Sequence, residues 1–117
     1  MTQSCQCSFD LECLRQLAHG DDGLLQNLLK TLQEDLECEI RAINQDAVNP
    51  DEKKISASLH RLKGIACLID AGPLAQAALA LSEQHGKDRA RHVHLLWVMA
   101  NLGDDIERAR SATGSDL

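Results

Sequence analysis

The chain has 117 residues, 18 of them acidic and 12 basic, which gives a formal net charge of −6. This length fits one domain. An acidic chain with one tryptophan, one phenylalanine and no tyrosine is a poor candidate for nucleic-acid binding, which relies on basic surfaces and aromatic stacking. The longest apolar stretches, residues 74–81 and 95–100, are far shorter than the roughly 18–20 residues that span a membrane. The start also lacks the basic and apolar segments of a secretory signal. We therefore expect a cytoplasmic domain without membrane contact.

Leucine and alanine supply most of the apolar residues, and only two prolines are present. Leucine and alanine favour helices, whereas strands favour β-branched and aromatic residues, which are few here. The composition therefore predicts an all-α domain.

The first predicted helix is short. Asp10 is a suitable N-cap, and the helix continues to about Ala18. His19–Gly20 ends it, because glycine readily adopts the left-handed conformation that follows a helix. Residues 1–8, which precede it, are small and polar, and this predicts a flexible N-terminus.

The second predicted helix is long and begins at Asp21 and Asp22, whose charges favour the positive end of the helix dipole. Asn49–Pro50 ends it. Apolar residues recur along it in steps of three or four, as expected for a helix with one buried face: Leu25, Leu29, Leu32, Leu36, Ile40, Ile43 and Ala47. The other side, which we expect to face solvent, carries Glu34, Asp35, Glu37 and Glu39.

Asp51 opens a third predicted helix, and Ala71–Gly72–Pro73 marks the boundary to a fourth. The third helix repeats the helical spacing at Ile55, Leu59, Leu62, Ala66 and Ile69. The fourth is rich in alanine and extends from Leu74 to about His85, with Gly86 ending it.

A fifth helix is predicted from about Asp88 to Ala109, followed by a flexible tail over residues 111–117. Its inward stripe is expected at Leu96, Met99, Leu102 or Gly103, Ile106 and Ala109, and Trp97 is assigned to the core. Short connections make consecutive helices antiparallel. Residues 9–110 are therefore predicted to form an antiparallel up-down four-helix bundle with a short additional N-terminal helix.

The third helix carries a histidine that should face away from the core. At about 100° per residue, His60 lies roughly 140° from the centre of the apolar stripe. A solitary surface histidine usually has no function, but this one has unusual neighbours. The face that it shares carries Lys53, Ser56, Lys63, Gly64 and Cys67.

Lys63 and Gly64 lie one turn beyond His60. Glycine inside a helix costs up to about 1 kcal/mol relative to alanine, and a physical reason to accept that cost is access to the imidazole. Lys63 supplies a positive charge for an anion on the ring. A neutral imidazole is nucleophilic. Nucleophile, cation and cleared space together suit phosphoryl transfer to a histidine.

The segment His60-Arg61-Leu62-Lys63-Gly64 resembles the signature of histidine-containing phosphotransfer (HPt) domains. It lies on the helix that follows a long acidic helix, and the similarity covers roughly residues 8–110. Segment Asp70–Gly72 resembles a variant found in HPt domains fused to hybrid sensor kinases, so the chain is either free-standing or the terminal domain of such a kinase.

The resemblance implies a role for each residue of the signature. His60 would be phosphorylated by an aspartyl phosphate on a receiver domain and would pass the group to a response-regulator receiver. Lys63 would stabilise the phosphoryl charge, and Gly64 would permit docking. The resemblance further implies a bacterial phosphorelay protein that acts as a monomer, without kinase activity, nucleotide or metal of its own. Mg²⁺ would belong to the receiver.

The chain departs from the family pattern at two places. Ile65 follows the glycine, where the family often has serine or alanine. Many members also have glutamine or glutamate facing the histidine from the next helix. The nearest residues here are Ser82, Glu83 and Gln84, and whether one of them assists His60 stays open.

The charge near His60 is opposite to that of the whole chain, because Lys53, Lys54, Arg61 and Lys63 lie within eleven positions. A receiver's active site is acidic, so this basic patch fits such a partner. Expected docking residues are Lys53, Ser56, Arg61 and Cys67.

Two alternatives use other features. The same bundle without phosphorylation would be a helical adaptor that binds a partner protein. In the second alternative, Cys5, Cys7 and Cys13 would make the chain a thiol or metal sensor. The chain has five cysteines, an odd number, and their spacings match no zinc-finger pattern. His92 and His94 lie two residues apart, which is not the i, i+4 spacing of a helical zinc site.

Overall fold

The computed structural model describes residues 9–83 and 88–114, and within these ranges the chain forms helices and no strand. This confirms the predicted all-α class. The helices are α1 (Leu11–Leu17), α2 (Asp22–Val48), α3 (Glu52–Ile69), α4 (Gly72–Glu83) and α5 (Arg89–Gly114). The predicted flexible N-terminus, His85 and Gly86 lie outside the described residues.

Aspartate side chains cap the first three helices, as predicted for Asp10, and the second and third helices start at the predicted aspartates. Asp10 accepts a hydrogen bond from the Glu12 amide, and Asp21 accepts one from Leu24. Asp51 accepts from the amides of residues 53 and 54. Each cap satisfies amide groups that lack a partner within the first turn of the helix. The starts of these helices are therefore local properties of the sequence.

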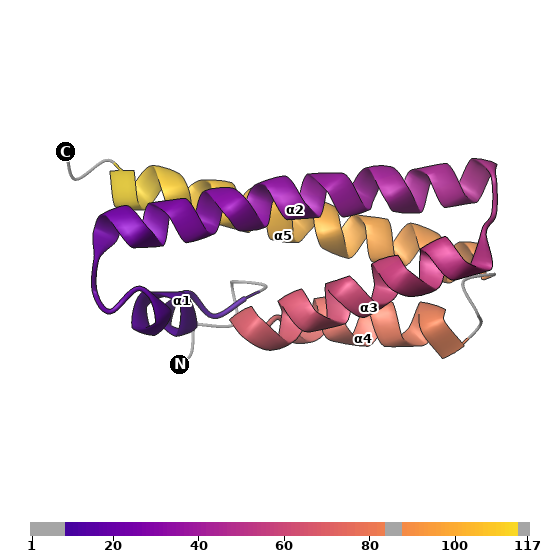
Figure 1. The fold of residues 1–117 in the computed structure, drawn as a ribbon, viewed down its shortest axis with the longest axis horizontal. Coiled ribbons are helices and arrows are strands. Elements are labelled where there is room, and N and C mark those ends of the chain that lie inside the picture. Colours follow the sequence, from indigo (N-terminus) through magenta and orange to yellow (C-terminus); the bar gives the residue numbers. More distant parts are fainter. Residues whose placement is uncertain (1–8, 84–87, 115–117) are drawn as a thin grey trace.

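The helices pack side by side around one core (Figure 1). α2 contacts α5 and α3, and α4 contacts α3 and α5. α1 packs against α2 and α3, and the Asp10 amide donates to the Ile69 carbonyl at 2.9 Å. Leucine and alanine dominate the buried residues, and the buried residues of α4 are Leu74, Ala77, Ala78 and Leu81. None of the described helices has a stretch long and apolar enough to cross a membrane.

The buried face of α2 is wider than the apolar spacing predicts. Glu39 is only 7% exposed and Asp46 only 8% exposed, whereas Ala47 is exposed. The assignment of Glu39 to the solvent face was therefore wrong. α2 lies between α3 and α5, and the two partners together cover polar positions beside the leucine stripe.

The inward face of α5 also differs from the prediction. Trp97 is 63% exposed, so its assignment to the core was wrong. The buried residues are His92, Leu95, Val98, Met99, Leu102 and Ile106. Because Trp97 lies two residues beyond Leu95, it is about 200° away around the axis. α5 continues to Gly114, so residues 111–114 are helical rather than part of a flexible tail.

Candidate functional site

α3 holds His60 on the surface in the middle of the helix. The side of α3 that faces the core contains buried residues at Ile55, Ser58, Leu59, Leu62, Ala66 and Ile69. His60 itself is exposed. The anchored apolar face thus turns the imidazole outward, in the direction that the periodicity predicts.

Several of the predicted docking residues lie beside His60. Lys53 and Ser56 are exposed, and together with Glu52, Ala57 and His60 they line a shallow surface hollow. This hollow lies on the N-terminal side of the imidazole along α3. The small side chains of Ser56 and Ala57 leave that approach open.

The C-terminal side of His60 is open as well. A Cβ atom built on Gly64 meets nothing within 4 Å, so internal packing does not require glycine at this position. Lys63 is half-buried and Cys67 is exposed. Lys63, Gly64 and Cys67 thus follow His60 on α3 within two turns, and the surface at Gly64 is open.

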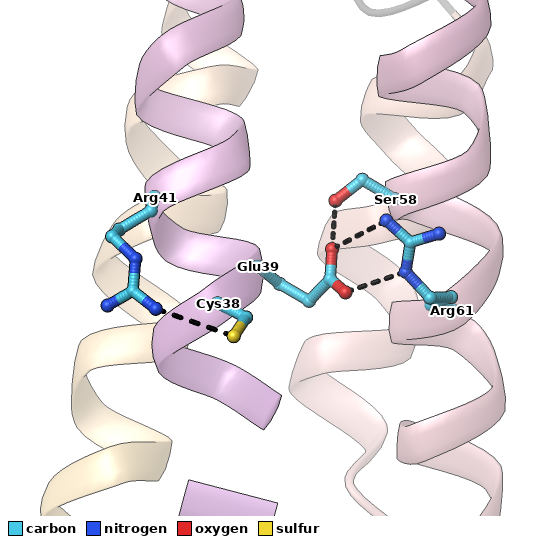
Figure 2. A network of polar contacts seen from close by, with 5 residues as sticks. All are labelled: Cys38, Glu39, Arg41, Ser58 and Arg61. Carbon is cyan, nitrogen blue, oxygen red and sulfur yellow. Dashed lines mark hydrogen bonds and ion pairs between the residues drawn. The ribbon is translucent and has the colours of Figure 1, made fainter. Parts of the chain in front are cut away.

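Arg61, one of the expected docking residues, is paired with a carboxylate of α2. Its Nε lies 2.6 Å from Glu39 Oε2, and its Nη2 lies 3.3 Å from Oε1. Ser58 Oγ donates to the same carboxylate (Figure 2). The hydrogen bond to Glu39 raises the pKa of Arg61, which stays charged. Its charge in the predicted basic patch is therefore compensated within the chain.

A second polar pair was missed by the sequence reasoning. His92 Nε2 lies 3.3 Å from Asp46 Oδ2, and both side chains are buried. They border a cleft between the end of α2 and the start of α5, which Pro50 and Leu96 also line. His92 shares helical spacing with Leu95 and Met99, but the spacing alone does not choose this face of the helix over the one through Leu96.

The residues proposed as metal or thiol ligands do not gather in the described part of the chain. Within residues 9–83 and 88–114, no group of three or more histidine, cysteine or acidic side chains is placed to hold a metal ion. His94 stacks on Trp97, with ring centroids 6.1 Å apart. Cys13 is a free thiol, while Cys5 and Cys7 lie outside the described residues.

The possible assisting residues on α4 are only partly described. Ser82 is half-buried and Glu83 is exposed, whereas Gln84 lies outside the described residues. The hydrogen bonds recorded for the described residues include none between these side chains and His60.

Comparison with protein families finds a match to the Hpt domain over residues 23–112, which covers α2 to α5 and includes His60. No curated protein and no solved structure matches the chain. The family match spans most of the sequence and contains the helix that exposes His60. The chain therefore belongs to the Hpt domain family, whose members carry out histidine phosphotransfer in two-component systems.

Proposed function

We propose that His60 is the phosphorylated residue of a phosphorelay intermediate. It accepts a phosphoryl group from an aspartyl phosphate on one receiver domain and passes it to an aspartate on the receiver of a response regulator. The observation that carries this proposal is an exposed histidine in the middle of α3, with open surface at Gly64, inside the matched Hpt region.

The transfer is a direct exchange of bonds at phosphorus. The lone pair of a ring nitrogen of neutral His60 forms an N–P bond, while the P–O bond to the receiver's aspartate breaks. The aspartate leaves as a carboxylate with that electron pair, and the other ring nitrogen keeps its proton. The second transfer reverses these steps on another receiver. No hydrolysis is involved, and no nucleotide is needed.

The neighbours of His60 supply charge and space. Lys63 stabilises the negative charge on the phosphoryl oxygens, and Gly64 leaves room for the receiver. Lys53, Ser56, Arg61 and Cys67 form the docking surface. Mg²⁺, the only cofactor of the exchange, is bound by the receiver. The domain is not a kinase.

The arrangement we propose for the whole domain is an antiparallel up-down four-helix bundle, α2 to α5, with α1 as the additional N-terminal helix. The helix contacts support it, because α2 and α4 each pack on α3 and α5. We propose that this bundle acts as a cytoplasmic monomer in a bacterial phosphorelay.

A transfer assay tests the proposal. The chain is mixed with a panel of receiver domains that carry labelled phosphate, and label on the chain is followed. We expect acid-labile, alkali-stable phosphate on the wild type and on His94→Gln, an exposed histidine on α5, but none on His60→Gln. Label that persists on His60→Gln contradicts the assignment. A receiver that binds the chain without labelling it favours the adaptor instead.

A further inference from the structure

One buried carboxylate of α2 holds two residues of α3 that flank His60. Glu39 accepts hydrogen bonds from Ser58 Oγ at 2.5 Å and from Arg61 Nε at 2.6 Å (Figure 2). Ser58 precedes His60 by two residues, and Arg61 follows it by one. Glu39 is 7% exposed and Ser58 is 1% exposed, so the contact lies between the helices.

These contacts restrain the rotation of α3 about its axis. Around an ideal helix, Ser58 lies about 160° from His60 and Arg61 about 100° from it, in the same direction. Both therefore lie toward the side of α3 that meets α2, whereas the imidazole of His60 faces solvent. The pair between Arg61 and Glu39 is bidentate and charge-assisted, and such pairs add directional specificity that apolar packing lacks.

Stability alone is a weak reason for this arrangement. Burying the Glu39 carboxylate carries a desolvation cost, and the side chain of Arg61 is 56% exposed, so solvent screens the ion pair and limits what it adds to stability. An ionic contact that bridges two helices restricts their relative orientation. Here the orientation of α3 relative to α2 decides where the imidazole of His60 points.

We propose that Glu39 is a positioning residue for phosphoryl transfer. By holding Ser58 and Arg61, it fixes the rotation of α3 and hence the direction from which His60 meets the phosphorus atom. The inference rests on the proposed function of His60. Phosphoryl transfer depends on a nucleophile placed in line with the leaving group, and a misplacement of about 1 Å costs up to about a hundredfold in rate.

The test measures transfer from a phosphorylated receiver as a function of receiver concentration, in parallel with labelling by phosphoramidate, a small donor that needs no docking. The variants are Glu39→Ala, Glu39→Gln and Ser58→Ala. The control is Gln33→Ala, which removes polar contacts from α2 to Glu107 and Arg110 on α5 and leaves α3 untouched.

We expect the limiting rate at saturating receiver to fall about tenfold in Glu39→Ala, with phosphoramidate labelling and the control unchanged. Circular dichroism on the same samples measures the folded fraction, so a loss of receiver transfer in a chain that stays folded separates positioning from stability. If circular dichroism shows that Glu39→Ala is unfolded, Glu39→Gln carries the test. Its amide oxygen still accepts from Ser58, whereas its amide nitrogen cannot accept from Arg61.

The inference alone is overturned by a limiting rate within about twofold of wild type in a folded Glu39 variant, or by an equal loss in Gln33→Ala. An equal loss of phosphoramidate labelling also overturns it. A wild-type chain that no receiver labels, or label that stays on His60→Gln, removes the proposed function and this inference with it.

Discussion

The imidazole Nε2 of His92 lies 3.3 Å from the Oδ2 atom of Asp46, in a buried contact between α5 and α2. The other oxygen of the same carboxylate, Oδ1, accepts a hydrogen bond from the Asp51 amide at 2.9 Å. One side chain thus joins the end of α2, the start of α3 and the beginning of α5. This links three helices at the end of the molecule that contains the α2–α3 connection.

Replacing Asp46 should weaken the fold. Asp46→Ala leaves the buried His92 Nε2 and the Asp51 amide without their partner, and an unsatisfied buried group costs about 1–3 kcal/mol. Urea unfolding followed by circular dichroism measures the effect, with Gln45→Ala, an exposed neighbour on α2, as the matched control. Equal unfolding midpoints for the two variants contradict the structural role of Asp46.

A bulky residue in place of Gly64 should impair docking rather than folding. Gly64→Ala should raise the free energy of unfolding by about 0.5–1 kcal/mol, because a Cβ meets nothing there and alanine favours the helix. Gly64→Leu should keep the fold but slow transfer from a receiver, since its side chain occupies the surface beside His60.

The matched control for this prediction is Ala100→Leu, at an exposed position on α5. Stopped-flow or quench measurements of transfer compare the two leucine variants. Wild-type rates in folded Gly64→Leu contradict the access argument.

Trp97 should contribute little to stability despite its size. Its side chain is 63% exposed, whereas Leu95 on the same helix is fully buried. We expect Trp97→Ala to change the free energy of unfolding by less than about 1 kcal/mol, and Leu95→Ala to lower it by about 2–5 kcal/mol. Chemical denaturation of both variants checks the difference, and similar losses count against the observed orientation of α5.

Cys13 should react slowly with alkylating reagents in the folded chain. Burial raises the pKa of its thiol, and the neighbouring charge of Asp10 and a hydrogen bond to that carboxylate raise the pKa further. The thiolate is the reactive form, so the curve of alkylation rate against pH should lie at higher pH in the folded chain than in urea.

Peptide mapping after iodoacetamide treatment measures this shift. Asp10→Asn retains a good N-cap and removes the charge, so it should move the folded curve back toward lower pH. Coincident curves for folded and unfolded chains are incompatible with the raised pKa of Cys13.

The starts of three helices and the outward direction of His60 follow from the sequence alone. Aspartate caps act on amides two or three residues away, and an apolar stripe at helical spacing defines the opposite face of its own helix. Both are short-range relations. Lys63 and Gly64 share the face of His60 for the same reason, and their spacing was sufficient to suggest phosphotransfer.

Only the tertiary structure decided which polar residues at the edges of the stripes are buried. Glu39 and Asp46 occupy positions on α2 that a single helix would leave in water, and α3 and α5 cover them. His92 faces inward and Trp97 faces outward because the contacts of α5 with α2 and α4 together set the rotation of α5 about its axis. These outcomes depend on residues distant in the sequence, whose relative positions no local periodicity specifies.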